Sequence, residues 1–195
     1  MTAVNFADGT WLNPPETWSV DASTLTLTTD AKTDFWRETH YGFTRDSGHF
    51  LGLPTKDGFT ASIRIQGAFR SLYDQAGLMV RIDAERWVKC GVEFTDGELF
   101  MSAVVTNGRS DWSVSQPLKH LEDFYLRLTL TNGAMRIQCS QDGQRWPLLR
   151  LAPFPAASSY LVGPTACTPE RSGLTVRFSE FKIGPAIASD LHDLS

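Results

Sequence analysis

Cysteine is scarce in this sequence: its 195 residues include three, Cys90, Cys139 and Cys167. Their number is odd, no Cys-x-x-Cys motif occurs, and Cys90 and Cys139 fall on the apolar faces of two predicted strands. A scaffold held together by disulfides is therefore disfavoured. We expect buried free thiols, as in proteins of the reducing cytoplasm.

Basic charge is also in short supply. Lys and Arg number 18 against 22 Asp and Glu, which gives a net charge of -4. Without a basic stretch, nucleic acid and anionic membranes are poor candidate partners. No apolar run reaches the length of a membrane-spanning helix, and the first residues show neither the basic nor the apolar region of a signal peptide. We expect a cytoplasmic protein.

Motifs of several enzyme classes are missing as well. The sequence has no Gly-x-Ser-x-Gly motif, no glycine-rich phosphate loop and no Asp/Asn-rich loop of the kind that binds calcium. The four histidines are scattered. His40 and Glu38 lie two residues apart and could ligate a metal in an extended segment, but His49 is an ambiguous third ligand. We expect neither a metal site nor a cofactor.

The segment from Leu72 to Trp112 contains four predicted strands joined by tight turns. Asp96-Gly97 and Asn107-Gly108 are hairpin signals, because both central residues of such turns need a positive φ. Along the first two strands apolar residues alternate with polar or small ones. Side chains two residues apart share a face of a sheet, so each strand has one apolar and one charged face. The charged face collects Gln75, Arg81, Lys89 and Glu93.

The rest of the chain continues the same pattern. Further strands are predicted at 24–28, 49–52, 59–66, 124–131, 135–139, 146–151, 160–164 and 174–183, with a turn at Pro54 and Asp57-Gly58. Segment 32–43 has no clean period and is predicted as a loop around a short strand, and 118–123 as a loop or one helical turn. Turn signals about every 8–12 residues predict an all-β, two-sheet antiparallel sandwich. We expect one domain over 1–195, with a loosely held tail from about 186.

Three stretches resemble a known family: KTDFWRETHYGF at 32–43, LYDQAGLMVRID at 72–83, and KCGVEFTDG at 89–97 followed by SDWS at 110–113. The family has no known function and is typified by a fungal protein named for regulation of enolase. Its members are similar to concanavalin A-like lectins and glucanases, which are jelly rolls with one concave sheet. The resemblance implies this fold over about residues 7–183. It implies no particular reaction, because the superfamily includes sugar binders, hydrolases and lyases.

The charged face is the candidate ligand site if it is the concave one. Aromatic rings pack against the C–H surface of sugars, and planar polar side chains form paired hydrogen bonds to vicinal hydroxyls. Both kinds of side chain lie on this face or near it, which predicts a non-catalytic binding or regulatory domain for a carbohydrate or related small metabolite. The predicted contact residues are Trp36, His40, Gln75, Arg81, Lys89, Glu93 and Trp112.

Other interpretations stay open. The charged face could be a solvated surface with cross-strand pairs such as Arg81 with Glu93, each contributing about 0.2–1 kcal/mol. Glu93 could act in a glycan hydrolase, which needs a second carboxylate about 5–5.5 Å or 6.5–9.5 Å away. No strand carries alternating acids, so that carboxylate would have to come from Glu38, Asp74 or Asp111.

Two further alternatives use the same surface. An eliminating lyase or isomerase would take His40 or Lys89 as its base. A protein-interaction or regulatory domain of carbohydrate metabolism would bind another polypeptide there. Glu170 and Arg171 lie in a polar segment that either flanks one mouth of the groove or is an ordinary surface turn.

Overall fold

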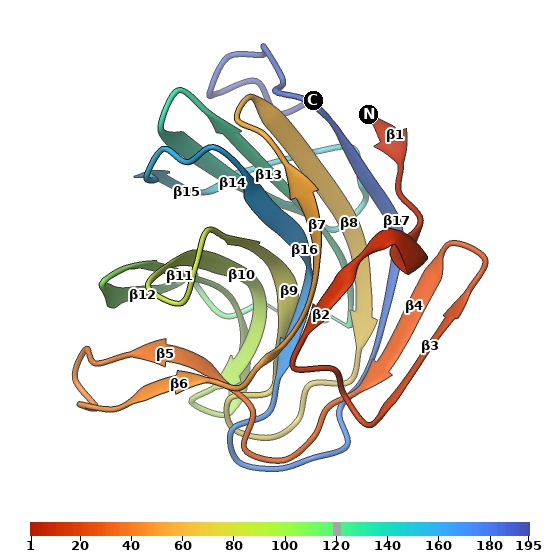
Figure 1. Ribbon diagram of the computed structural model, residues 1–195, viewed down its shortest axis with the longest axis vertical. Helices are drawn as coiled ribbons and strands as arrows, with labels where there is room; N and C mark the ends of the chain where they lie inside the picture. The colour runs from red at the N-terminus through yellow and green to blue at the C-terminus, as the bar shows by residue number, and fades with distance from the viewer. Residues whose placement is uncertain (119–121) are drawn as a thin grey trace.

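The computed structural model of the chain is a sandwich of two antiparallel β-sheets (Figure 1). It describes residues 1–118 and 122–195. Within these ranges the eight-stranded sheet contains, in spatial order, β15 (Leu148–Pro153), β14 (Ala134–Ser140), β13 (Asp123–Thr131), β8 (Phe59–Gly67), β17 (Thr175–Pro185), β4 (Thr24–Thr28) and β3 (Thr17–Asp21), with β1 (Thr2–Ala3) paired to β17. The predicted all-β, two-sheet antiparallel sandwich of jelly-roll, concanavalin A-like type is confirmed.

The second sheet carries the segment that the sequence pattern singles out. Over the same described ranges this seven-stranded sheet contains β12 (Arg109–Val114), β11 (Glu98–Asn107), β10 (Arg86–Thr95), β9 (Gln75–Arg81), β16 (Tyr160–Cys167), β7 (His49–Thr55) and β2 (Thr10–Leu12). A 3-10 turn, Phe6–Asp8, precedes β2. The four strands predicted between residues 72 and 112 are β9 to β12.

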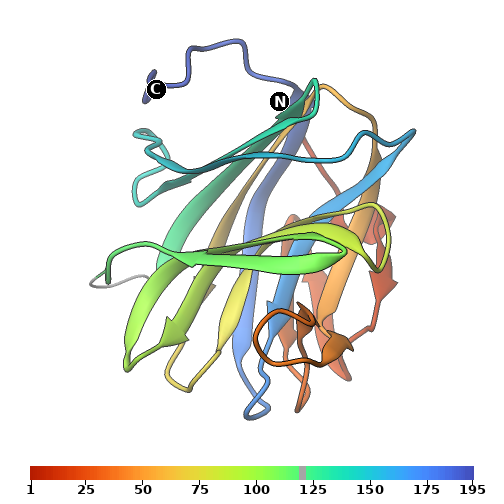
Figure 2. The ribbon, with the colours of Figure 1, turned by 90° about the vertical axis from the view of Figure 1, so that its left-hand side faces the viewer.

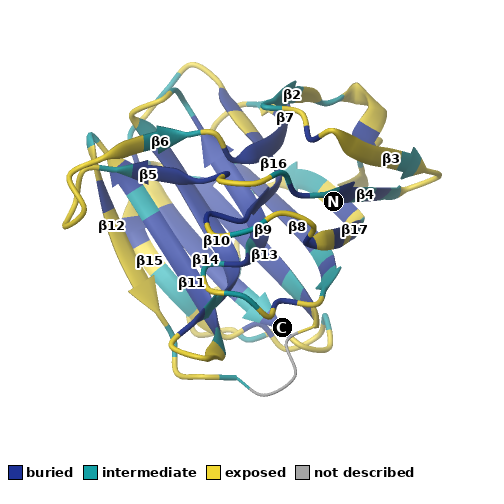
Figure 3. Cartoon of the chain, turned by 90° about the horizontal axis from the view of Figure 1, so that it is seen from below, coloured by how far each residue is buried: buried dark blue, intermediate teal, exposed yellow. Residues whose placement is uncertain are grey.

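The apolar faces of the two sheets meet in the core. Figure 3 shows that the strands of both sheets carry many buried residues. Leu78 and Val92 of the seven-stranded sheet, for example, pack in one cluster with Ile63 and Leu128 of the eight-stranded sheet, and all four are almost fully buried. Alternation along each strand explains this arrangement, because every second side chain points to the same face. The other face of β9 and β10 is therefore turned away from the core.

The turns follow the sequence signals with one difference. Asp96 and Gly97 both have positive φ, at 52° and 79°, as the tight turn between β10 and β11 requires. At Asn107-Gly108 the only positive φ belongs to Gly108, at 76°. The hairpin between β11 and β12 therefore forms as predicted, but its turn has a different backbone conformation from the expected one.

The turn predicted at Pro54 is wrong. It lies within β7 and pairs with Leu161 of β16, although its type suggested a turn. β2 pairs with β7 only at Phe50, Leu51 and Gly52, so the strand is an edge at Pro54. A proline is tolerated there because its missing N–H leaves no ladder hydrogen bond unmade.

Segment 32–43 forms most of a separate hairpin, in which β5 (Phe35–Arg37) pairs with β6 (Thr44–Asp46). This hairpin lies in front of the seven-stranded sheet, on the side away from the core (Figure 2). Arg37 fastens it to the sheet: its backbone N–H donates to Ser110 Oγ at 2.9 Å and its side-chain Nε to the carbonyl of Gly108 at 2.9 Å. The charged face of β9 and β10 is therefore covered.

Both chain ends lie at the same end of the sandwich (Figures 1 and 2). The single domain over 1–195 and the loose hold on the tail stay predictions, although Arg127 and Arg136 donate hydrogen bonds to tail carbonyls. The stretch 118–123, predicted as a loop or helical turn, includes residues 119–121, which lie outside the described ranges. In the parts of the chain that are described, no helix is long and apolar enough to span a bilayer.

Candidate functional site

A pocket of about 250 Å³ lies between the β5–β6 hairpin and the seven-stranded sheet. We call it the hairpin pocket. Its floor comes from β9, β10 and β11, and its walls come from the hairpin, β12 and two loops. The lining residues are Asp34, Trp36, Tyr41, Phe43, Arg45, Tyr73, Gln75, Lys89, Glu93, Val104, Trp112, Pro169 and Glu170.

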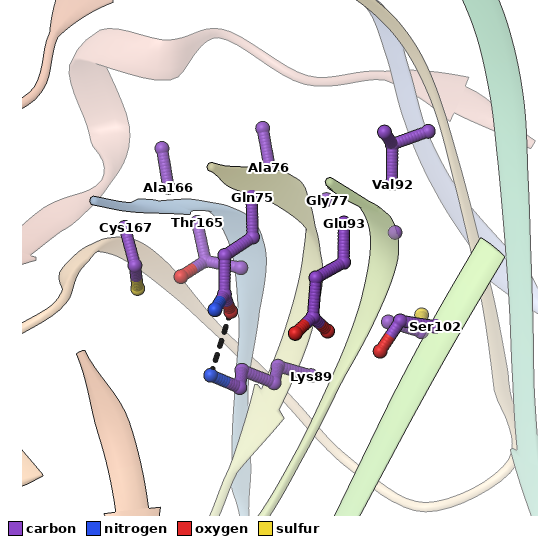
Figure 4. Close-up of a pocket in the computed structure, with 12 residues that line it drawn as sticks. Gln75, Ala76, Gly77, Lys89, Val92, Glu93, Ser102, Thr165, Ala166 and Cys167 are labelled. Atoms are coloured by element: carbon purple, nitrogen blue, oxygen red, sulfur yellow. Dashed lines mark hydrogen bonds between the residues drawn. The ribbon is translucent and has the colours of Figure 1, made fainter. Parts of the chain in front are cut away.

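Strand register places the polar floor. Gln75 of β9 stands directly opposite Glu93 of β10, and Lys89 precedes Glu93 by four residues on the same face. The Lys89 ammonium donates to Gln75 Oε1 at 2.7 Å (Figure 4). It also donates to Asp34 Oδ1 at 3.1 Å, from the segment just before β5. One cation thus joins the floor of the pocket to the base of the hairpin.

The environment shifts the pKa of both ionisable floor residues. Burial raises the pKa of Glu93, and the nearby Lys89 charge only partly offsets this effect. Burial alone would lower the pKa of Lys89, but Asp34 and neighbouring acidic groups raise it above its ordinary value. Lys89 therefore stays charged, while Glu93 takes up a proton more readily than an exposed glutamate.

A small hollow opens in the floor where two glycines face each other. Gly77 of β9 and Gly91 of β10 are paired in register, and neither has a side chain to fill the space above them. The hollow measures about 20 Å³ and is bordered by Gln75, Lys89 and Glu93 (Figure 4). Such a volume holds about one water molecule or one hydroxyl group. Ser102 and Thr165 add polar side chains to this border, as a bound hydroxyl would need.

Aromatic rings form the walls. Tyr41 contacts Trp36 edge to face at 5.5 Å between ring centroids and stacks on Phe43 at 5.5 Å. On the opposite wall, Trp112 is 37% exposed and its indole N–H donates to Glu93 Oε2 at 3.2 Å. The Tyr41 and Tyr73 hydroxyls are 3.2 Å apart, and this contact joins the hairpin tip to the turn before β9.

Five of the seven predicted contact residues line the pocket, and two do not. Trp36, Gln75, Lys89, Glu93 and Trp112 are brought together. Trp36 is only 8% exposed, however, and its indole N–H is satisfied by the carbonyl of Thr39 at 3.0 Å. The exposed ring available to a ligand is thus that of Trp112 rather than both tryptophans.

Arg81 lies outside the pocket and does not pair with Glu93. Its guanidinium donates two hydrogen bonds to Asp46 of β6, at 2.8 and 2.7 Å. Arg81 lies six positions along β9 from Gln75, which is about 20 Å along a strand. Apolar side chains fill the space between them, in a second cluster that contains Phe35, Trp36, Phe50, Met79, Trp87, Val104 and Cys167. Sharing a face therefore does not bring Arg81 to the site.

His40 is also displaced from the pocket. It lies at the exposed tip of the hairpin with a positive φ of 63°, and its ring packs edge to face on Tyr41 at 4.9 Å. The other histidine considered, His49, is buried and satisfied: its two ring nitrogens contact the Asn13 carbonyl at 2.7 Å and the Asp30 N–H at 3.0 Å. Among described residues, no group of three His, Cys, Asp or Glu side chains is arranged to hold a metal ion.

The three carboxylates considered as partners of Glu93 are engaged elsewhere. Glu38 pairs with Arg109 at 3.0 Å, and Asp111 pairs with Arg150 at 2.9 Å. Asp74 is fully buried and accepts from Arg171 Nε at 2.8 Å. The carboxylates that do share the pocket with Glu93 are Asp34 and Glu170.

Sequence reasoning missed several lining residues. Asp34, Tyr41, Phe43 and Arg45 belong to the hairpin segment, whose dense mixture of aromatic and charged residues was the available signal. Tyr73 lies in the turn before β9, and no sequence signal indicated that it would line a pocket. Glu170, one of two residues weighed as flanking a groove, lines the pocket.

Comparison with known proteins identifies the family. A family model described as "Protein of unknown function (DUF1349)" matches residues 11–186. "Regulation of enolase protein 1" of Saccharomyces cerevisiae is 57% identical over 189 residues, which cover 97% of this chain and 96% of that protein.

Two solved structures are similar to this fold. The crystal structure of a functionally unknown protein from Saccharomyces cerevisiae has a TM-score of 0.92 and 55% identity, covering 95% of this chain and 100% of that chain. The carbohydrate-binding module CBM66 from Bacillus subtilis has a TM-score of 0.58 at 15% identity, covering 89% and 94% of the two chains, and shows likeness of fold alone. The resemblance predicted from three stretches of sequence is confirmed, and the chain belongs to the family of proteins of unknown function DUF1349.

Proposed function

We propose that the protein is a non-catalytic binding or regulatory domain that holds a carbohydrate, or a related hydroxyl-rich metabolite, in the hairpin pocket. The observation that carries the proposal is the convergence of two kinds of group on one cavity. Trp112 and Tyr41 offer aromatic faces, and Gln75, Lys89 and Glu93 offer donors and acceptors beside the glycine hollow. A pyranose needs both kinds, because it has an apolar C–H surface and a rim of hydroxyls.

The charges of the pocket favour a neutral ligand. Lys89 and Arg45 supply two positive groups, and Asp34, Glu93 and Glu170 supply three carboxyl groups, of which Glu93 has a raised pKa. Lys89 is already paired with Asp34 at 3.1 Å. A phosphate would therefore find little unpaired positive charge, whereas hydroxyl groups can both donate and accept among these side chains.

The size of the pocket sets the length of the ligand. Its volume of about 250 Å³ is just below the range of roughly 300–1,000 Å³ that is typical of ligand pockets. A monosaccharide or a short oligosaccharide suits this space. The shared sandwich fold of the Bacillus subtilis carbohydrate-binding module supports the ligand class at the level of architecture.

Thermal-shift screening against neutral mono- and oligosaccharides, polyols and sugar phosphates tests the proposal. A ligand that binds the folded state raises its stability by mass action, by about 2.7 kcal/mol at one hundred times its Kd. We expect a neutral sugar to raise the Tm, and Trp112→Ala to abolish that rise. Trp18→Ala is the matched control, because Trp18 is an exposed tryptophan of β3 away from the pocket. A panel without any shift, or equal losses in both variants, would count against the proposal.

Glycan hydrolysis is the second candidate, favoured by one observation. Asp34 and Glu93 line the same pocket, and the raised pKa of Glu93 is what a general acid needs. Against it, Asp34 is held by Lys89. Release of nitrophenol from aryl glycosides by the wild type, with loss in Glu93→Gln, would establish hydrolysis. Binding without turnover would support the first candidate.

A protein partner is the third hypothesis, and it uses the same surface. The name of the yeast relative, "Regulation of enolase protein 1", suggests a regulatory role toward another polypeptide. Cross-linking of the purified chain to a candidate partner, with and without a sugar that raises the Tm, would separate the two uses of the pocket.

A further inference from the structure

The outward face of the eight-stranded sheet carries two buried arginines. Arg127 of β13 stands opposite Gln138 of β14, and Arg136 of β14 stands opposite Thr129, so the two arginines are diagonal neighbours on one face. Arg127 is 7% exposed and Arg136 is 8% exposed. Such burial is unusual for guanidinium groups unless they are paired with acids.

No carboxylate of the described residues forms a salt bridge with either arginine. Arg127 donates to Gln138 Oε1 at 3.0 Å and to the main-chain oxygen of Ser195 at 3.0 Å. Arg136 donates to three main-chain carbonyls between Ser189 and Asp193, at 3.1 to 3.3 Å. The Arg136 acceptors are main-chain carbonyls, so this guanidinium is hydrogen-bonded but is not paired with a carboxylate.

The site also has an unused donor. The Nε of Arg136 is buried and has no hydrogen-bond partner among residues 1–118 and 122–195. Burial and the neighbouring Arg136 charge lower the pKa of Arg127 to about 10, with only Asp193 acting in the opposite direction. This face of the sheet therefore has more positive charge and more donor capacity than its present contacts use.

The segment from Ile187 to Ser195 covers the two arginines. Its backbone follows the sheet face: Ile187 N–H donates to Thr60 Oγ1 at 3.0 Å, and the Leu194 carbonyl accepts from Trp146 N–H at 2.8 Å. Trp146 in turn stacks under the Arg127 guanidinium, whose central carbon is 4.4 Å from the ring centroid. The segment, IASDLHDLS, is acidic and has leucines at 191 and 194 that are half-buried.

We propose that this arginine face is a docking surface for an extended acidic peptide of a partner protein, and that the chain's own segment 187–195 occupies it as an intramolecular competitor. The segment shows how such a ligand binds, with carbonyls on the arginines and with two half-buried leucines. A peptide with more carboxylates would supply the charge that the carbonyls do not. The surface lies on the sheet opposite the hairpin pocket, so the inference is independent of the proposed function.

Binding of a fluorescent peptide to the full-length chain tests the inference, with the synthetic nonapeptide IASDLHDLS as the probe. In the wild type the segment blocks the face, and we expect weak binding. The double substitution Leu191→Ser and Leu194→Ser weakens the intramolecular contact, and we expect the probe to bind that chain at least tenfold more tightly. Binding should weaken as salt is added, because the contact is between opposite charges.

Two controls identify the site. Adding Arg136→Gln to the double variant should weaken probe binding at least tenfold, and a probe in which both aspartates are replaced by lysine should not bind. If the glutamine variant fails to fold by circular dichroism, the lysine-substituted probe decides instead, because it leaves the chain unchanged. The inference is overturned if the double variant gains no affinity for the probe, or if the gain survives loss of Arg136 or of the acidic side chains.

Discussion

At the scale of single residues, buried ion pairs determine where the β5–β6 hairpin rests. Arg81 and Lys89 both project from the seven-stranded sheet, and each forms a salt bridge with a carboxylate of the hairpin segment. Their partners, Asp46 and Asp34, lie 35 and 55 residues away in sequence. These two contacts form the polar seam between hairpin and sheet.

Arg81→Ala should destabilise the fold rather than weaken ligand binding directly. The Arg81 side chain is 8% exposed, so its loss leaves Asp46 without its bidentate partner at a partly buried position. We expect a cost of about 2–4 kcal/mol, at the lower side of values for buried pairs. Urea unfolding measures it. Arg64→Ala is the control, because Arg64 makes a similar pair with Asp123 in a more exposed place and should cost about 1 kcal/mol or less. Equal costs would contradict this account.

Glu93 should make stability fall as pH rises. Its pKa in the folded chain is raised by burial above the ordinary value of 4.5, so the folded state binds the proton more tightly than the unfolded state. The contribution to stability is fully present below pH 4.5 and is lost as pH rises through the folded pKa. The difference in unfolding free energy between wild type and Glu93→Gln should therefore shift against the wild type as pH rises above 4.5.

Asp123 provides the opposite slope as a control. The hydrogen bond from Arg64 lowers the pKa of Asp123 below 3.8, so its contribution is present above that pH and lost as pH falls through the folded pKa. Asp123→Asn should therefore be less stable than the wild type above pH 3.8, and this difference in unfolding free energy should shrink as pH falls through the folded pKa. If Glu93→Gln and Asp123→Asn show the same pH trend, the environment assigned to Glu93 is wrong.

At the scale of elements, the paired strands β9 and β10 shape the floor of the pocket through their glycines. A Cβ on Gly91 would lie 2.0 Å from the Ala76 carbonyl oxygen, and a Cβ on Gly77 would lie 1.8 Å from that of Cys90. These contacts are with backbone, which cannot rotate away. The close approach of the two strands here therefore requires glycine at both positions.

Gly91→Ala should cost about 2–3 kcal/mol or more, because the strands must separate to admit the methyl group. Gly67→Ala is the matched control in β8, where a Cβ would first meet a Phe69 ring carbon at 3.2 Å, a side chain that can move. Chemical denaturation of the two variants provides the comparison. A milder effect in Gly91→Ala than in Gly67→Ala would show that the strand pair is more adaptable than its geometry indicates.

At the scale of the whole molecule, the thiols report on the integrity of both apolar clusters. Cys90 lies in the core between the sheets and Cys167 in the cluster under the hairpin. Burial raises the pKa of each to about 12. Cys139, which is half-buried, also has a pKa raised by burial. Because the thiolate is the reactive form, folding should protect all three.

Titration with a thiol-reactive dye at about pH 8 should label the native chain slowly and label three thiols in urea. Cys139→Ser should remove most of the slow native labelling, since Cys90 and Cys167 are buried more deeply. Rapid labelling of the native protein would place a thiol at the surface. Two fewer reactive thiols in urea would reveal a disulfide instead of the predicted free cysteines.

The fold was predictable because alternation and turn signals are local. The alternation along each strand identifies its apolar face. Two sheets bury their apolar faces by packing them against each other. Thr24–Thr28 is a strand in prediction and structure alike. Pro54 misled the prediction because its tolerance depends on whether a neighbouring strand lies beside it, which is a property of the assembled sheet.

The sequence by itself determined the sandwich, its core faces and the strands that carry Gln75, Lys89 and Glu93. Tertiary structure alone decided what those residues face. Alternation along a strand decides which side chains share a face. The hairpin that covers this face lies tens of residues away in sequence and is held there by Asp34 and Asp46. That covering buries Arg81 against the hairpin, leaves His40 at the tip, and joins Tyr41 and Trp112 around one cavity. The alternation of apolar and polar residues does not predict such contacts, because they join segments that are far apart in sequence and close only in the folded structure.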